Sequence, residues 1–200
     1  MLMNKIEFFA MNNPLRAVIQ EIIEVKTLQR LSQLTTGKIV LEIGCGNGTG
    51  AKLIKKYFHP KSITAIDLDE RMIRIAKRKN SDPSVLFEVA DAASLPYKNN
   101  IFDAVFDFGI IHHIPNWRDC IKELHRVMKS KGELLIEDLS IETFTSGVGK
   151  PLRRILAHPY KTMYTRKDFF RYLQEVGFTM QTKKLYAPLG FQYFIVIARK

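Results

Sequence analysis

The sequence predicts an α/β fold with a doubly wound, mainly parallel sheet, and the alternation of its elements is the first reason. Apolar runs typical of strands alternate with helical patterns from residue 39 to about residue 138. This alternation places helices on both faces of a parallel sheet. Two further observations mark one edge of that sheet as a binding site. A glycine-rich loop follows the first apolar run, and the second run ends in Asp67.

A helix is expected before the sheet. Asn13 is a good cap and Pro14 suits the first helical position. Seven apolar residues then recur at the spacing of one helical face: Leu15, Val18, Ile19, Ile22, Val25, Leu28 and Leu31. We expect this helix to pack on the sheet as part of an N-terminal flank, residues 1–37. A second interpretation makes it part of a lid, with Phe8-Phe9-Ala10-Met11 near the carboxyl ends of the strands.

The core of the fold is predicted over residues 38–138. Its strands are expected at 39–43, 62–67, 85–89, 102–108 and 133–138. Its helices are expected to begin at Asn47 or Thr49, at Asp69 and at Asn116, and to end at Tyr57, Lys79 and Met128.

The last part of the chain, residues 165–200, is predicted as a helix followed by two strands. Thr165 and Asp168 form a capping-box pattern for a helix that ends before Gly177. Strands are expected over 178–185 and 191–199, joined by Ala187-Pro188-Leu189-Gly190.

Glycine occupies every second position of the loop after the first strand, at Gly44, Gly46, Gly48 and Gly50. This spacing leaves no side chain between the backbone and a ligand lying over the end of the strand. Glu42 precedes the loop. A carboxylate such as Asp67, at the end of a second parallel strand, can accept hydrogen bonds from both hydroxyls of a ribose. The pattern therefore predicts a cofactor that contains adenosine.

A dinucleotide cofactor is the first alternative, because Gly46-x-Gly48-x-x-Ala51 fits the loose fingerprint of such sites. In that fingerprint the first glycine follows the strand directly, which here is Gly44. In that frame Thr49 replaces the third glycine. Glu42 would also repel a pyrophosphate. The position of the glycines favours a different adenosine cofactor.

Five ordered motifs resemble those of the class I S-adenosylmethionine-dependent methyltransferases. They span roughly residues 38 to 138 and read Val40-Leu41-Glu42-Ile43-Gly44-Cys45-Gly46-x-Gly48, Ala65-Ile66-Asp67-Leu68-Asp69-x-x-Met72, Ala90-Asp91-Ala92-x-x-Leu95-Pro96-Tyr97, Phe102-Asp103-Ala104-Val105 and Gly132-Glu133-Leu134-Leu135-Ile136. The resemblance implies one methyltransferase domain over residues 1–200. It also implies a Rossmann-like, seven-stranded sheet closed by a C-terminal antiparallel hairpin. The Leu-Pro-Tyr element and His112-His113-Ile114-Pro115 resemble the branch that methylates quinone rings, other small molecules or lipids.

The resemblance also implies roles for particular residues around S-adenosylmethionine and its product, S-adenosylhomocysteine. Glu42, Gly44, Cys45 and Gly46 should contact the methionine part, whose ammonium group a carboxylate favours. Asp67 should hold the ribose. Around the adenine we expect Leu68, Met72, Asp91 and Ala92, and near the sulfonium Phe108 and Gly109. Asp91 has a second interpretation, as a helix cap or the start of an Asx-turn.

Methyl transfer from a sulfonium is an in-line displacement that depends mainly on alignment. A base would help if the acceptor were a phenol or an activated carbon, and histidine is the obvious type. His113, just past the fourth strand, is the candidate for this acceptor-side role. The alternative is that His112 and His113 cap or pack beneath the helix that follows.

Residues 139–164 are expected to form a substrate cover. Apolar residues alternate there with basic ones: Ile141, Phe144, Val148, Leu152, Ile155 and Leu156. Such a segment suits an amphipathic cover that receives a lipid-like acceptor at an anionic membrane surface. An ordinary lid with a solvated basic face is the alternative.

The formal net charge of +11 leaves a nucleic-acid methyltransferase as the competing function. Nine basic residues stand against three acids over residues 139–184. However, the fourth strand ends in Asp107-Phe108-Gly109-Ile110, whereas methylation of base amines commonly uses Asn/Asp-Pro-Pro-Tyr. A small-molecule or lipid-like acceptor is therefore favoured over RNA or DNA. A third class is a protein that binds the cofactor without transferring methyl groups, or a dehydrogenase.

The two cysteines, Cys45 and Cys120, lie in unlike settings and indicate neither a disulfide framework nor a metal site. No uncharged stretch approaches the ~20 residues that span a bilayer, and the first residues contain no cleavage-like sequence. We expect a cytoplasmic location, no transmembrane segment and no bound metal.

Overall fold

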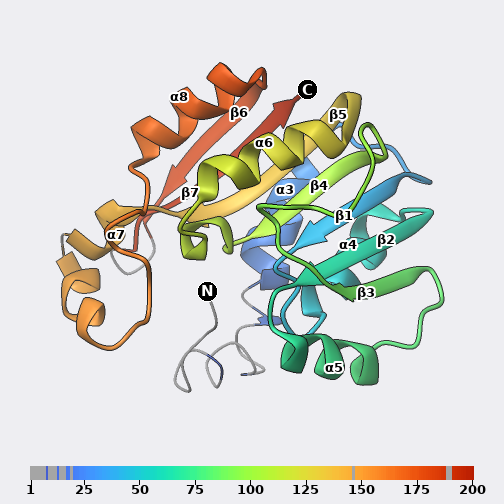
Figure 1. The fold of residues 1–200 in the computed structure, drawn as a ribbon, viewed down its shortest axis with the longest axis horizontal. Helices are drawn as coiled ribbons and strands as arrows, with labels where there is room; N and C mark the ends of the chain where they lie inside the picture. Colours follow the sequence, from blue (N-terminus) through green and yellow to red (C-terminus); the bar gives the residue numbers. More distant parts are fainter. Residues whose placement is uncertain (1–7, 9–12, 14–16, 19, 146, 188–190) are drawn as a thin grey trace.

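The computed structural model describes residues 8, 13, 17–18, 20–145, 147–187 and 191–200, and its centre is a seven-stranded sheet (Figure 1). The strands are β1 (Ile39–Ile43), β2 (Ser62–Asp67), β3 (Val85–Val89), β4 (Phe102–Phe108), β5 (Met128–Leu139), β6 (Thr179–Tyr186) and β7 (Tyr193–Arg199). Their order across the sheet is β3-β2-β1-β4-β5-β7-β6. β7 pairs antiparallel with β5 and β6, and the other pairs are parallel. The predicted fold, including its C-terminal hairpin, is confirmed.

Helices and short helical turns connect the strands. They are η1 (Gln20–Val25), α3 (Lys26–Leu31), α4 (Thr49–Phe58), α5 (Glu70–Lys79), η2 (Ile111–His113), α6 (Trp117–Val127), α7 (Ile141–Thr145), η3 (Gly147–Arg154) and α8 (Arg166–Val176). The predicted caps at Thr165 and Gly177 are present and Asp69 caps α5, whereas the side chain of Asn116 makes no cap hydrogen bond to α6. The Asp69 side chain accepts from the Arg71 N–H, the Thr165 side chain accepts from the Asp168 N–H, and Gly177 ends α8 in the left-handed region.

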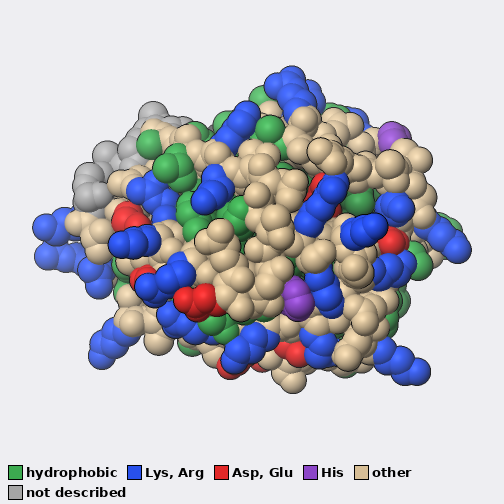
Figure 2. All heavy atoms as spheres, turned by 90° about the horizontal axis from the view of Figure 1, so that it is seen from above, with side chains coloured by type: hydrophobic (Ala, Val, Ile, Leu, Met, Phe, Trp, Pro, Cys, Tyr) green, Lys and Arg blue, Asp and Glu red, His purple; other side chains and the backbone are tan. Residues whose placement is uncertain are grey.

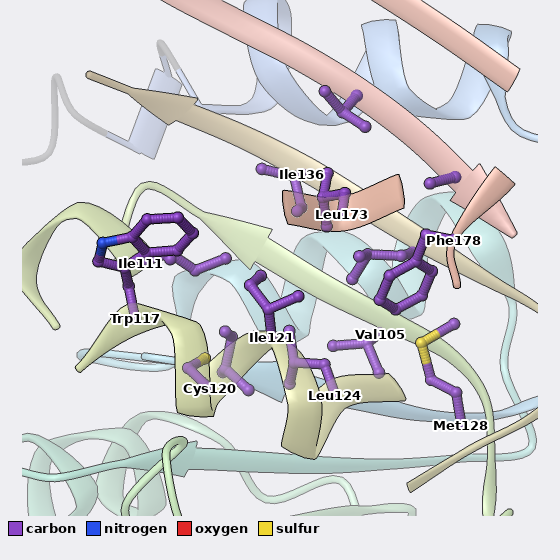
Figure 3. Packing of buried hydrophobic residues seen from close by; sticks show 14 of the residues in the cluster. Val105, Ile111, Trp117, Cys120, Ile121, Leu124, Met128, Ile136, Leu173 and Phe178 are labelled. Atoms are coloured by element: carbon purple, nitrogen blue, oxygen red, sulfur yellow. The ribbon is translucent and has the colours of Figure 1, made fainter. Parts of the chain in front are cut away.

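Alternate side chains of the strands build two hydrophobic layers, one on each face of the sheet. On one face, α6 and α8 pack on residues such as Val105 and Ile136 (Figure 3). On the other face, α3, α4 and α5 pack on Val40, Ala104 and Phe106. This arrangement follows from the two-residue period of a strand, which sends neighbours to opposite faces. The loops at the carboxyl edge of the sheet are thereby held on a rigid base.

The N-terminal helix differs from the prediction. Residues 20–25 form a π-helix before α3, and Val18 and Ile22, expected on the buried face, are 49% and 58% exposed. A π-helical turn shifts the residues that follow around the axis, so a spacing counted for an α-helix no longer marks one face. Val25 and Leu28 are buried as expected. Pro14, Leu15, Ile19 and the segment 9–11 lie outside the described residues.

The predicted cover is a short α-helix, a 3₁₀ helix and a series of turns, found at the end of the sheet where β5 stops (Figure 1). Only part of its apolar set is buried. Phe144 is 1% exposed, whereas Ile155 is 49% exposed. The side chain of Val148 lies outside the described residues. Within the part of the chain that the structure describes, no helix has both the length and the apolar character needed to cross a membrane.

Candidate active site

The glycine loop leaves β1 in a conformation that requires glycine at its first position. Gly44 has φ +63°, and a Cβ there would overlap the side chain of Ile110. Gly46 also has a positive φ, of +51°, but the space that its Cβ would enter holds no protein atom within 4 Å. The loop is thus packed against the protein at Gly44 and open at Gly46.

Asp67, at the end of β2, anchors this loop. Its Oδ2 accepts from the Gly46 N–H at 2.8 Å, and its Oδ1 accepts from the Asp69 N–H at 2.8 Å. Burial raises the pKa of this carboxyl, and the two backbone donors oppose that shift. Each oxygen keeps a second lone pair. Asp67 can therefore accept hydrogen bonds from a ligand while it holds the loop.

Glu42, in β1, has a buried carboxyl group, and one of its oxygens is not hydrogen-bonded by the described residues. Its Oε2 has no hydrogen-bond partner among the described residues. Burial, and then the charge of Asp67, raise the pKa of Glu42 well above its ordinary value. A buried acceptor without a donor is costly, and an ammonium group would satisfy it.

Two cavities meet at Gly44. One, of about 310 Å³, is lined by Glu42, Cys45, Gly46 and Phe108 together with Gly44. The other, of about 210 Å³, has predicted site residues in its wall, listed here: Gly44, Asp67, Leu68, Asp91, Ala92 and His113. Each cavity has an acidic residue in its wall, so the pair of cavities suits a ligand that binds a carboxylate at each of its ends. The structure thus brings most of the predicted cofactor residues to one cleft.

Two predicted contacts are not on these walls. Met72 is fully buried and has no exposed surface to offer to an adenine. Gly109 follows β4 but lines neither cavity. Asp91 does line the cleft, and it also forms the Asx-turn considered above, because its Oδ1 accepts from the Ala93 N–H at 2.9 Å. The two roles of Asp91 are compatible.

His113 belongs to a group of three imidazoles that the sequence did not reveal. The rings of His112 and His113, on η2, lie 4.1 Å apart between centroids. His158, in the cover, lies 5.1 Å from the first and 4.3 Å from the second. Burial, followed by the neighbouring imidazole of His112, lowers the pKa of His113 well below its ordinary value and that of His158 to about 3. Through His158 the cover therefore contacts His113, which lines the cofactor cleft.

A buried carboxylate orients this group. Asp138, near the end of β5, is in a short contact with His112 Nδ1 and accepts from the His112 N–H at 3.1 Å and from the Tyr164 hydroxyl at 2.6 Å. The sequence predicts no role for Asp138, His158 or Tyr164. The only signal was the His158-Pro159-Tyr160 segment in the cover, and nothing in its spacing links it to η2.

A seven-stranded sheet closed by an antiparallel C-terminal hairpin, with a glycine loop after β1 and an acidic residue at the end of β2, agrees with the resemblance to the class I S-adenosylmethionine-dependent methyltransferases. Residues 41–136 match the family described as a methyltransferase domain. This segment of the chain is therefore a methyltransferase domain, the resemblance found in the sequence is confirmed, and S-adenosylmethionine is the cofactor of the class. The orphaned oxygen of Glu42 and the open space at Gly46 fit that cofactor.

Known proteins resemble this chain over parts of its length. A phthiotriol/phenolphthiotriol dimycocerosates methyltransferase of Mycobacterium ulcerans is 34% identical over 60% of this chain and 46% of its own length. A fatty-acid O-methyltransferase of Mycolicibacterium smegmatis is 34% identical over 51% of this chain and 37% of its own. The chain thus spans less than half of these relatives.

A solved S-adenosylmethionine-dependent methyltransferase of Mesorhizobium loti shares the fold, with a TM-score of 0.74. Its sequence is 15% identical over 88% of this chain and 96% of that one.

Proposed function

We propose that this chain transfers the methyl group of S-adenosylmethionine to a lipid-like small molecule. The observation that carries the proposal is the pair of cavities that meet at Gly44, with Glu42 in one wall and Asp67 in the other. The two bacterial relatives are named for acceptors that are lipids or fatty acids, and this supports a lipid-like acceptor here.

In this proposal each cavity holds one end of the cofactor. Glu42, Cys45 and Gly46 bind the methionine part, and the carboxylate of Glu42 pairs with its ammonium group. Asp67 accepts from the ribose hydroxyls, while Leu68, Asp91 and Ala92 surround the adenine. The cofactor supplies an electrophilic methyl group when bound. The protein contributes alignment, which can lower the barrier by about 7 to 11 kcal/mol.

The acceptor side of the cleft is assigned to the cover and to His113. His113 lines the cavity next to Gly44 and also contacts His158 of the cover, so it joins the two regions. We assign it as the acceptor-side residue. Residues 139–164 then govern which acceptor reaches the cleft.

The cover also has the composition of a membrane contact. Three exposed basic side chains of the cover are Lys150, Arg153 and Arg154. Among the described residues, no carboxylate forms an ion pair or a hydrogen bond with them. The exposed Ile155 lies beside them. Each basic side chain near anionic lipid contributes about 1 kcal/mol. A cytoplasmic protein that touches an anionic membrane through this segment would collect its acceptor there.

Nucleic acid remains the competing acceptor because of the net charge. Lys and Arg side chains are spread over the face shown in Figure 2 and do not gather in one track. This face therefore gives no support to nucleic-acid binding, since a track of basic side chains is the usual footprint of such binding.

Labelled transfer tests the proposal. The whole chain is incubated with methyl-labelled S-adenosylmethionine and, separately, with lipid, soluble-metabolite and RNA extracts. We expect the label in the lipid fraction. Label in RNA alone would replace the lipid acceptor by a nucleic acid, and binding of the cofactor without transfer to any fraction would contradict the proposed activity.

A further inference from the structure

The three imidazoles of the acceptor side have the arrangement of a metal-ligand set. One ring nitrogen from each of His112, His113 and His158 can be chosen so that all three atoms lie within 4.8 Å of one another. Zinc bonds to imidazole nitrogen at about 2.0 to 2.1 Å, so in a tetrahedral site two such nitrogens are about 3.3 Å apart. The three nitrogen atoms therefore need to approach one another by at most roughly 1.5 Å to hold the ion.

Asp138 provides the outer partner that metal-binding histidines usually have. A carboxylate can only accept, so the contact with Asp138 places the proton of His112 on Nδ1 and leaves Nε2 as the ligand atom. Carboxylate, imidazole and metal in this order are typical of histidine sites. The second oxygen of Asp138 is held by the Tyr164 hydroxyl, which fixes the carboxylate in turn.

The surroundings suit a metal of the zinc class. Imidazole ligands favour zinc and its neighbours among the transition metals over magnesium or calcium, which prefer oxygen. The ring of Phe144, almost fully buried, lies 4.8 Å from His158 and closes one side of the group against water. The negative charge of Asp138 offsets part of the charge of a cation.

We propose that His112, His113 and His158 bind one divalent transition-metal ion of the zinc class, with its fourth position open toward the cofactor cleft. Three protein ligands and one open position are the pattern of catalytic rather than structural zinc sites. The opening is on the cleft side because His113 lines the same cavity as Asp67. This inference departs from the expectation of no metal, which rested on the two cysteines.

The open position also defines the acceptor, a step that rests on the proposed function. Zinc binds oxygen, nitrogen and sulfur donors, and a lipid-like acceptor offers oxygen, so the acceptor is an alcohol or a carboxylic acid. An alcohol that binds the metal loses its proton to solvent more readily. Its oxygen then bonds to the methyl carbon as the bond from carbon to sulfur breaks. The electron pair of that bond stays on sulfur, which becomes a neutral thioether.

Packing is the competing explanation, because three neutral rings can fill an aromatic cluster without any metal. The two explanations differ in a substitution that keeps the ring. His158→Phe preserves an aromatic side chain between Phe144 and Tyr160 but removes one ligand atom. If the group only packs, this variant behaves like the wild type. If the group binds metal, the variant loses it.

The test uses the whole chain, stripped of metal with a chelator and then titrated with zinc chloride by calorimetry. We expect one equivalent to bind and to stay bound through desalting, as measured by elemental analysis. Changing an outer partner alone weakens metal affinity by about 10 to 100-fold, so losing a ligand in His158→Phe should cost more than about 100-fold. The matched control is His59→Asn, an exposed histidine at φ +48°, where asparagine is tolerated.

Cobalt(II) keeps the test decisive if His158→Phe folds poorly. The wild type should give the intense visible absorption of four-coordinate cobalt. His158→Cys should retain the metal and add a thiolate charge-transfer band. Less than stoichiometric zinc in the wild type, or equal affinity in His158→Phe, overturns the site. S-adenosylhomocysteine is titrated in parallel. If S-adenosylhomocysteine binds but zinc does not, the metal site is wrong and the proposed function stands. If zinc binds but S-adenosylhomocysteine does not, the proposed function is wrong and the metal site stands.

Discussion

Glu42 and Asp67 line the cofactor cleft from neighbouring parallel strands, whereas on the acceptor side His113 and His158 meet from segments far apart in the chain. The register of β1 on β2, with Ile43 beside Ile66, aligns the two strand ends directly. The acceptor side instead depends on the packing of the cover against η2 and β5, through His158 and Tyr164. Backbone pairing thus fixes the cofactor half, and side-chain contacts fix the acceptor half. The two halves should therefore respond to different substitutions.

The largest effect should come from Asp67→Ala, because Asp67 both anchors the loop and faces the ribose. We expect affinity for S-adenosylhomocysteine to fall by about 3 kcal/mol, the upper end of the range for hydrogen bonds to a charged group. Calorimetric titration measures it. Asp103→Ala is the matched control: Asp103 accepts from the Ile39 N–H at 2.8 Å at the other end of β1, away from both cavities. Equal losses of affinity in the two variants would remove Asp67 from the site.

Gly46→Ala separates backbone strain from loss of the ligand. Both Gly46 and Gly37 have positive φ, and a Cβ at either position meets no protein atom within 4 Å. Alanine at each should therefore lower the free energy of unfolding by a similar amount, about 1 to 2 kcal/mol. Only Gly46→Ala should also weaken the binding of S-adenosylhomocysteine, by about 2 kcal/mol, because the Cβ of the introduced alanine would enter the space that the cofactor occupies. Denaturant unfolding and calorimetry give the two quantities.

Glu42→Gln should raise the stability of the fold and weaken the binding of the cofactor. Because the native pKa of Glu42 is raised, the folded protein keeps a proton that the unfolded chain has released above pH 4.5. Stability of the wild type therefore falls as pH rises from 4.5 through the native pKa, and glutamine removes this contribution. At pH 7 we expect Glu42→Gln to be more stable than the wild type and to bind S-adenosylhomocysteine about 1.5 kcal/mol more weakly.

Asp107→Asn is the control for these two effects of Glu42→Gln. Asp107 is also a fully buried acid with an oxygen that has no hydrogen-bond partner among the described residues, and burial raises its pKa as well. It lines neither cavity. Its variant should gain stability at pH 7 without losing cofactor affinity. A loss of affinity in Asp107→Asn as large as in Glu42→Gln would mean that Glu42 acts through the fold and not through contact.

The smallest effect on cofactor affinity is expected from the cover, whose arginines line neither cavity. Replacing both Arg153 and Arg154 by glutamine should weaken binding to anionic vesicles by about 1 kcal/mol for each charge, and the salt dependence should shrink with it. Vesicle sedimentation at several salt concentrations measures this. A wild-type protein that ignores anionic vesicles but binds structured RNA with a steep salt slope would favour the nucleic-acid function instead.

The strands, α8 and the glycine loop could be predicted because a local pattern marks each of them: alternation, a capping box, and glycine after a strand. The antiparallel pairing of the C-terminal hairpin was predicted from the family resemblance. The N-terminal flank was predicted less well, since the π-helical turn at residues 20–25 leaves no mark in the apolar spacing. For the acceptor side the sequence predicted His113 and the cover, but not the contacts that join them. His158 and Tyr164 reach Asp138 and η2 only through tertiary packing, and Met72, placed beside the adenine by resemblance, lies beneath the surface.

The division of the site into two independent halves is tested most directly by titrating S-adenosylhomocysteine into three proteins in one calorimetric series: the wild type, Gly46→Ala and the double variant Arg153→Gln, Arg154→Gln. We expect wild-type affinity in the double variant and an affinity about 2 kcal/mol weaker in Gly46→Ala. An equal loss in both variants, or no loss in Gly46→Ala, would contradict a cofactor cleft built by the β1 loop independently of the cover.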